Sequence, residues 1–180
     1  MIILSLGSNL PSKWGNRMQT LDFAMAQLRK YRITIIKKSS FYCSAPMTLT
    51  YKNSLNTQLA DDDQLPDQYY INVTLMVQTS KGAAPLLYCL KQIERAAGRV
   101  AGKRWASRPL DIDIIDYKGV ICGHGVEYNQ RIHAGFLPLT LPHPGLTKRA
   151  FVLEPLEQIA PFWHHPQNGK TAHQLINALK

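Results

Sequence analysis

The chain has 180 residues, of which 45% are hydrophobic and 18% are charged. These values are typical of one globular domain with a sizeable core, here residues 1–180, and they exclude wholesale disorder. A formal net charge of +9 predicts an anionic partner, either a phosphorylated small molecule, a nucleic acid or a membrane surface.

The first residues, Met1 to Gly7, carry no basic leader and are too short for a signal core or a membrane span. We therefore expect a buried strand over residues 2–6, followed by a turn. The three widely spaced cysteines, Cys43, Cys89 and Cys122, form no disulfide framework and no zinc pattern. Such usage predicts a reducing, cytoplasmic location.

Residues 13–30 are predicted to be helical, because Met18, Leu21, Met25 and Leu28 recur at helical spacing. Residues 32–42 are predicted to form a second strand. The pattern fails over residues 44–68, where polar side chains dominate, and we expect a long surface loop there. The acidic run at 61–63 within this loop is expected to be solvated and not to bind a metal.

Alternation of apolar and polar side chains predicts a strand over residues 69–79. A helix is expected over residues 84–97, with Pro85 in its first turn and Gly98 at its C-terminal end. Further elements are expected downstream: a strand at 110–116, a turn at 117–119 leading to a hairpin at 120–122, and helices at 147–159 and 171–179.

The order β-α-β, then β-α-β, is the ferredoxin-like split pattern. The predicted fold class is therefore α+β, with a ferredoxin-like antiparallel sheet, helices packed on it, and an extra C-terminal hairpin and helices. This topology would bring Asn72 close to Asp111 and Asp113 on the open face of the sheet.

The strand at 110–116 carries the most informative pattern. Asp111 and Asp113 are two apart and so point to one face, whereas Ile112 and Ile114 point to the core. Adjacent carboxylates repel unless a cation lies between them, and oxygen-only ligands suit Mg²⁺. The preceding loop holds four cations, Arg99, Lys103, Arg104 and Arg108. Both features could be solvated surface, but their juxtaposition favours a site for Mg²⁺ and a polyphosphate.

Several segments resemble the 6-hydroxymethyl-7,8-dihydropterin pyrophosphokinase family of folate biosynthesis, through nearly the whole chain. The central signature is Arg-Trp-Ala-Ser-Arg-Pro-Leu-Asp-Ile-Asp at 104–113. Other matching segments, in order, are Leu-Gly-Ser-Asn-Leu at 6–10, Ser-Ser-Phe-Tyr at 39–42, Tyr-Ile-Asn at 70–72, Ile-Glu at 93–94 with Gly-Arg at 98–99, Leu-Pro-His at 141–143, and the blocks at 148–156 and 159–161.

The resemblance implies transfer of the β,γ-diphosphate of ATP to the pterin hydroxymethyl group, with release of AMP. It implies Mg²⁺, as two ions, on Asp111 and Asp113, and ATP as co-substrate. Arg99 and Arg108 would clamp the triphosphate and serve as catalytic residues. The residues implied around ATP are Glu94, Lys103, Ile114, Thr140, His143 and Arg149. Those implied around the pterin are Ser44, Ala45, Met47, Tyr70, Asn72, Trp105 and Phe151.

The chain departs from the family pattern at Ala101, Ala106, Ser107, Gly145 and Lys91. None of these changes removes the carboxylate pair or the two arginines, so activity is still expected. The resemblance also implies a monomer that acts on small molecules, without nucleic acid or membrane partners.

Two other functions are compatible with parts of the sequence. A basic, ferredoxin-like nucleic-acid-binding module would need exposed aromatics in an RNP-type motif, and none is found. Another Mg²⁺-nucleotide transferase, such as a D-x-D glycosyltransferase, would be short at 180 residues. A Walker-type phosphate loop is absent from the sequence.

Overall fold

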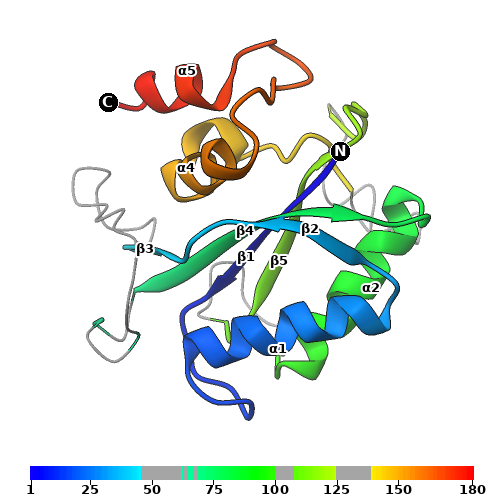
Figure 1. Ribbon diagram of the computed structural model, residues 1–180, viewed down its shortest axis with the longest axis vertical. Coiled ribbons are helices and arrows are strands. Elements are labelled where there is room, and N and C mark those ends of the chain that lie inside the picture. The colour runs from blue at the N-terminus through cyan, green and yellow to red at the C-terminus, as the bar shows by residue number, and fades with distance from the viewer. Residues whose placement is uncertain (46–61, 63–64, 67–68, 100–107, 125–138) are drawn as a thin grey trace.

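The computed structural model describes residues 1–45, 62, 65–66, 69–99, 108–124 and 139–180 (Figure 1). Its elements, in chain order, are β1 (Ile2–Ser8), α1 (Arg17–Lys30), β2 (Thr34–Lys38), β3 (Tyr42–Ser44), β4 (Tyr70–Gln78), α2 (Ala83–Ala96), β5 (Asp111–Tyr117), the 3₁₀ helix η2 (Leu146–Lys148), α4 (Ala150–Ile159) and α5 (Ala172–Asn177). None of the described helices is both long and apolar enough to cross a bilayer.

The strands form one five-stranded sheet in the order β2-β4-β1-β5, with β3 also paired to β4. All of its ladders are antiparallel. The predicted α+β class with an antiparallel sheet is therefore confirmed. Because β1 lies between β4 and β5, side chains from these two strands meet across a single central strand.

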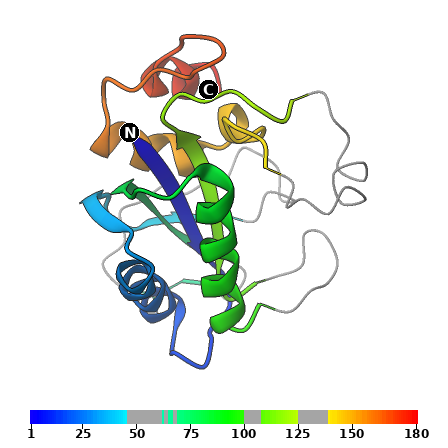
Figure 2. The ribbon, with the colours of Figure 1, turned by 90° about the vertical axis from the view of Figure 1, so that its right-hand side faces the viewer.

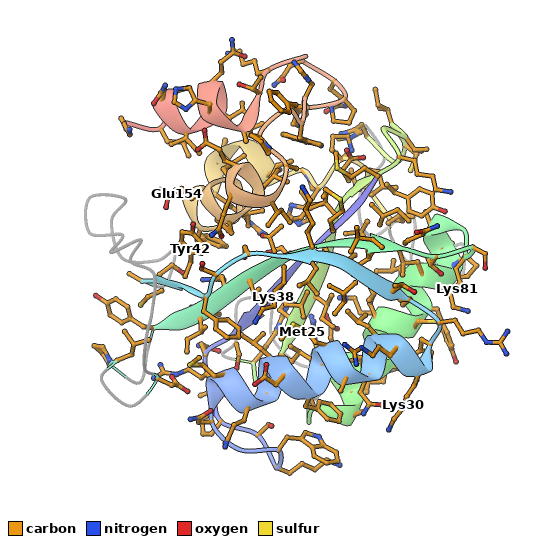
Figure 3. The ribbon with its side chains drawn as sticks, viewed as in Figure 1. Met25, Lys30, Lys38, Tyr42, Lys81 and Glu154 are labelled. Atoms are coloured by element: carbon orange, nitrogen blue, oxygen red, sulfur yellow. The ribbon has the colours of Figure 1, made fainter. Side chains whose placement is uncertain are left out.

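Helices cover the two faces of the sheet differently (Figures 1 and 2). On one face, α1 and α2 pack over a core that includes Leu4, Val73 and Leu90. Met25 lies between α1 and the sheet on this side (Figure 3). On the other face, α4 and α5 cover Ile3 and other buried apolar residues. The rest of that second face carries polar residues.

Helix α1 begins at Arg17, four residues later than predicted, because Asn16 caps it. Asn16 Oδ1 accepts from Gln19 N at 3.0 Å, and Gln19 Oε1 accepts from Asn16 N at 2.9 Å. This reciprocal pair is a capping box, which satisfies two backbone donors at the helix start. Helix α2 ends as predicted, because Gly98 follows its last turn at φ +96°.

The predicted single strand over residues 32–42 is wrong, because the chain breaks into β2 and β3 around Ser39. Ser39 N donates to Thr74 O, and Ser39 Oγ accepts from Thr74 N, both at 3.0 Å. The hydroxyl thus takes the acceptor position that a backbone carbonyl would hold in a regular ladder. Between the pairs Lys38–Leu75 and Tyr42–Asn72, the segment that joins β2 to β3 therefore has one residue more than the facing part of β4.

The expectation that the whole acidic run at 61–63 is solvated is wrong for its middle residue. Asp62 is 3% exposed and forms an ion pair with Arg17, at 2.6 Å from Oδ1 to Nε. A carboxylate buried this deeply is tolerated because a cation and hydrogen-bond donors surround it. Asp61 and Asp63 lie outside the described residues.

The C-terminal part differs from expectation in detail. The helix predicted at 147–159 is a 3₁₀ turn followed by α4, and the last helix is shorter than predicted. The chain turns at Lys118 and Gly119, but Cys122 then forms an isolated bridge with Leu141. Within the described residues, the segment at 120–122 forms no ladder with β5, as the predicted hairpin would have required.

Candidate functional site

The candidate site lies where β4, β1 and β5 run side by side on the polar part of the sheet. Gly7 of β1 pairs with Asn72 of β4 on one side and with Asp111 of β5 on the other. A Cβ on Gly7 would lie 3.1 Å from Asn72 Oδ1, so the glycine leaves room for the carboxamide. The predicted proximity of Asn72 to the carboxylates is therefore present.

Asp111 and Asp113 share one face of β5, and Ile112 and Ile114 are buried on the other, as the alternation predicted. Both carboxylates retain solvent access, with side chains 37% and 27% exposed. Their place on one face of β5 follows from period-two alternation in a strand at the edge of the sheet.

Asp111 is surrounded by cations. Arg99 Nη1 donates to Asp111 Oδ1, and Arg108 Nη1 lies 3.5 Å from the same oxygen. Burial alone would raise the pKa of Asp111. The charges of Lys91, Arg99 and Arg108, with the Arg99 hydrogen bond, outweigh burial, so the pKa lies below its usual value.

Glu94, on α2, lies behind this group and is 1% exposed. Its Oε1 accepts from Lys91 Nζ and from Ile112 N, each at 2.7 Å, and Arg99 Nη1 lies 2.7 Å from its Oε2. Burial raises the pKa of Glu94, and the Lys91 charge acts in the opposite direction. Glu94 thereby ties α2, β5 and Arg99 together.

Asp113 has its own cationic neighbours from the C-terminal part of the chain. Arg149 Nη1 donates to Asp113 Oδ2 at 3.2 Å, and His143 Nε2 lies 3.5 Å from the same oxygen. Desolvation lowers the pKa of His143, with Asp113 opposing and Arg149 reinforcing the change. A Cβ on Gly145 would lie 2.9 Å from Arg149 Nε, so this departure from the family pattern makes room for Arg149.

On the other side of Gly7, the carboxamide of Asn72 is fixed by β3. Asn72 Nδ2 donates to Ser44 Oγ at 2.9 Å, and both residues are buried. Tyr70 is half-buried, and burial followed by the Asp111 charge raises its pKa. The Arg149 guanidinium lies over the Phe151 ring, with Cζ of Arg149 5.9 Å from the centroid of that ring.

The remaining predicted site residues vary in position. Ala45 is half-buried just after β3, and Thr140 Oγ1 donates to Gly123 O at 3.5 Å. The Ile114 side chain packs in the core between the sheet and α2, so any contact with a ligand would use its backbone. Met47, Lys103 and Trp105 lie outside the described residues.

Two residues at the site were missed by sequence reasoning. Asn9 is 4% exposed, and its Oδ1 accepts from Arg108 N at 2.9 Å, which anchors the arginine next to Asp111. Gly7 stands inside β1, and a glycine within a strand often marks a close approach by another group. That signal was present in the sequence, whereas the Asn9–Arg108 bond joins residues 99 positions apart.

The carboxylate pair has the right chemistry for a hard divalent cation. Each described contact of the pair falls on Oδ1 of Asp111 or Oδ2 of Asp113, which leaves the second oxygen of each carboxylate for another ligand. No group of three or more His, Cys, Asp or Glu side chains within the described ranges forms a closed cage. An open carboxylate pair suits Mg²⁺, which keeps waters and substrate phosphates in its shell.

Fold and site together define an α+β protein that gathers paired carboxylates, arginines and a buried amide on one sheet face. A model of the family "7,8-dihydro-6-hydroxymethylpterin-pyrophosphokinase (HPPK)" matches residues 3–161. The chain belongs to this family.

Individual relatives agree with this assignment. A 2-amino-4-hydroxy-6-hydroxymethyldihydropteridine pyrophosphokinase of Haemophilus influenzae is 33% identical over 158 residues, 87% of this chain and 79% of that protein. The Synechocystis protein of the same name is 38% identical over 114 residues, 63% of this chain and 52% of its own length. The mitochondrial folate synthesis bifunctional protein of Arabidopsis thaliana is 32% identical over 155 residues, 86% of this chain and 22% of that protein.

Among solved structures, wild-type HPPK-DHPS of Plasmodium falciparum is similar in fold. The TM-score is 0.67 at 18% identity, over 98% of this chain and 44% of that chain. The chain therefore spans about half the length of the Synechocystis relative, and less of the bifunctional ones.

Proposed function

We propose that the chain transfers the β,γ-diphosphate of ATP to the hydroxymethyl group of 6-hydroxymethyl-7,8-dihydropterin and releases AMP. The observation that carries this proposal is the carboxylate pair Asp111 and Asp113, flanked by Arg99, Arg108 and Arg149 on one sheet face. Membership of the pyrophosphokinase family supports the choice of reaction.

The arginines are suited to bind the triphosphate. Arg99 and Arg108 neutralise the Asp111 carboxylate. A polyphosphate offers these guanidinium groups stronger, bidentate acceptors, so they can turn from the carboxylate to the phosphate oxygens. The buried Glu94 carboxylate lies 2.7 Å from Arg99 Nη1 and would keep the arginine at the site during this exchange. Both arginines would then stabilise charge as it develops on the phosphates.

Asp111 and Asp113 would hold Mg²⁺, as two ions, in keeping with their open oxygen pair. When bound, Mg²⁺ would neutralise phosphate charge and orient the reacting groups. Arg149 and His143 contact the Asp113 carboxylate, whereas Arg99 and Arg108 contact Asp111. The roles given to Lys103, Ile114 and Thr140 around ATP belong to the same proposal.

The pterin would bind on the Asn72 side of Gly7. A buried carboxamide offers a donor and an acceptor together, which matches the edge of a pterin ring. Ser44 Oγ accepts from Asn72 Nδ2 and so fixes the carboxamide. The proposed pterin pocket also includes Tyr70, Ala45 and Phe151. The sequence resemblance adds Met47 and Trp105, both outside the described residues, to this proposal, and the Trp105 indole would stack on the flat ring.

We further propose that residues 1–180 form a single pyrophosphokinase domain. It would act as a monomer on small molecules in the cytoplasm, without nucleic acid or membrane partners. The net charge of +9 would then serve to attract the anionic phosphates of ATP.

The direct assay is formation of AMP from ATP. AMP should appear only when ATP, hydroxymethyl-dihydropterin and Mg²⁺ are all present, in a one-to-one ratio with the diphosphorylated pterin. Formation of ADP in place of AMP would indicate transfer of a single phosphoryl group. AMP formation that does not require the pterin would indicate hydrolysis, and either result would contradict the proposal.

A further inference from the structure

Arg17, the first residue of α1, is buried, and all of its guanidinium donors are used. Nε donates to Asp62 Oδ1 at 2.6 Å, and Nη1 donates to Pro66 O and Tyr69 O, each at 3.0 Å. Nη2 donates to Asp62 O at 3.1 Å and to Leu65 O at 3.3 Å. A guanidinium has five N–H donors, and each of the five is paired here.

Asp62 also completes the start of α1. Its Oδ2 accepts from Arg17 N at 2.8 Å and from Met18 N at 3.4 Å. These are the first two backbone donors of the helix, which otherwise lack intrahelical acceptors. An anionic side chain at this end also interacts favourably with the helix dipole. The pair thus joins the start of α1 to a segment 45 residues later in the sequence.

The contact with Tyr69 O connects this pair to the candidate site. Tyr69 immediately precedes β4, whose first residue, Tyr70, pairs with Ser44, and whose third residue is Asn72. The ladder between β3 and β4 covers only three residue pairs, so it is short. The charges of the pair also reach the Cys43 thiol of β3. Burial raises the pKa of this thiol, the Arg17 charge lowers it and the Asp62 charge raises it, and the net shift is upward.

We propose that Arg17 and Asp62 are positioning residues for the pterin side of the site. By holding Tyr69, they set where β4 begins and so fix Tyr70 and Asn72 relative to Ser44. None of the described hydrogen bonds or ion pairs of Arg17 and Asp62 involves the carboxylates or arginines of the proposed ATP region. Losing either residue would thus weaken pterin binding more than ATP binding. This kinetic consequence rests on the proposed function.

Two variants test the kinetic side of this inference. Asp62→Asn keeps the shape and the acceptor oxygen but removes the charge, and Arg17→Met removes every donor of the guanidinium. Both should raise the KM for hydroxymethyl-dihydropterin about tenfold, because small misplacements of binding groups are costly, while the KM for ATP changes less than twofold. Arg17→Lys keeps a cation opposite Asp62 and should fall between Arg17→Met and the wild type.

Matched controls are available on the exposed side of the same helix, where Asp22→Asn and Arg29→Met make the same chemical changes. Both should leave the two KM values unchanged. Equal rises in both KM values for Asp62→Asn and Arg17→Lys would show general destabilisation and overturn the inference. So would a pterin KM within twofold of the wild type in Arg17→Met.

Hydrogen exchange tests the positioning without any enzymatic activity. Amides 70–72 should exchange at least tenfold faster in Asp62→Asn than in the wild type, while amides in β5 keep their protection. Arg17→Lys provides the same readout if Asp62→Asn does not fold. Unchanged exchange at 70–72 would contradict the positioning role. Absence of AMP formation by the wild type would contradict only the proposed function.

Discussion

Asn72 and Asp111 lie on either side of the same residue, Gly7, and so are brought together by three adjacent strands. One is an amide fixed by Ser44, and the other is a carboxylate held among cations. The proposed pterin and phosphate regions therefore meet over a strand position without a side chain. This relationship leads to a first prediction.

Gly7→Ala should weaken pterin use more than ATP use. The new Cβ would lie 3.1 Å from Asn72 Oδ1, so the carboxamide must move and strain its bond to Ser44. We expect a several-fold rise in the pterin KM and a loss of about 1 kcal/mol of unfolding free energy. Steady-state kinetics and urea unfolding measure these effects.

Gly82→Ala is the control for this variant, since its Cβ would meet Pro85 at an ordinary 3.7 Å. An unchanged pterin KM in Gly7→Ala would mean that Asn72 does not need this space.

Lys91→Met should destabilise the protein more than an equivalent change on the surface. It removes the ammonium that lies 2.7 Å from the buried carboxylate of Glu94, although Arg99 remains as a second cation. We expect a loss of about 1–3 kcal/mol in unfolding free energy, below the full cost of an unpaired buried charge. Arg95→Met, at an exposed position of the same helix, should cost less than about 0.5 kcal/mol. Equal stabilities for the two variants would refute the role of Lys91.

Gly145→Ala tests how Arg149 is accommodated. The added Cβ would lie 2.9 Å from Arg149 Nε and 3.2 Å from His143 Cε1, so the arginine must shift from Asp113. The expected result is a several-fold rise in the ATP KM. In an Arg149→Met background the same change should have a much smaller effect, because only the 3.2 Å approach to His143 Cε1 remains. Additive effects in that double-mutant cycle would show that Gly145 acts elsewhere.

His165 should make folding stability depend on pH below neutrality. It is 5% exposed, its Nδ1 accepts from Gln167 N at 3.2 Å, and desolvation lowers its pKa from the ordinary 6.5. The unfolded state therefore binds a proton at a higher pH than the folded state does. Stability present above pH 6.5 is lost as the pH falls through the folded-state pKa, by up to about 1.4 kcal/mol per pH unit.

The measurement for His165 is unfolding free energy against pH for the wild type and His165→Asn. The variant keeps an acceptor but cannot ionise, so its slope should be smaller. His164→Asn, at the exposed neighbouring position, should keep the wild-type slope. Identical slopes for all three proteins would show that His165 does not contribute.

Local patterns predicted the parts of the structure that depend on local spacing. The alternation in residues 110–117 placed Asp111 and Asp113 on one face and Ile112 in the core, as observed. The capping box of α1 was also readable, since Asn16 stands three residues before Gln19, although the predicted helix began earlier. In these cases the interacting side chains lie within one turn or one strand.

Contacts between distant segments could not be predicted in this way. Ser39 interrupts the second strand because its hydroxyl binds Thr74 N, 35 residues away. Asp62 is buried because it pairs with Arg17 at the start of α1. The acidic residues next to Asp62 in the sequence had instead suggested a solvated run. Asn9 Oδ1 accepts from Arg108 N, although the two residues are 99 positions apart in the sequence. Such pairs join residues that lie far apart in the sequence, so local spacing does not reveal them.

The most direct test of the central claim is the turnover of Asp111→Asn and Asp113→Asn, measured as AMP formation at saturating ATP, pterin and Mg²⁺. Each variant keeps the shape of the side chain but loses the charge that would hold the cation. Turnover should fall by about a thousandfold or more, while Asp22→Asn stays at the wild-type rate. Near-normal turnover in either site variant would contradict the account.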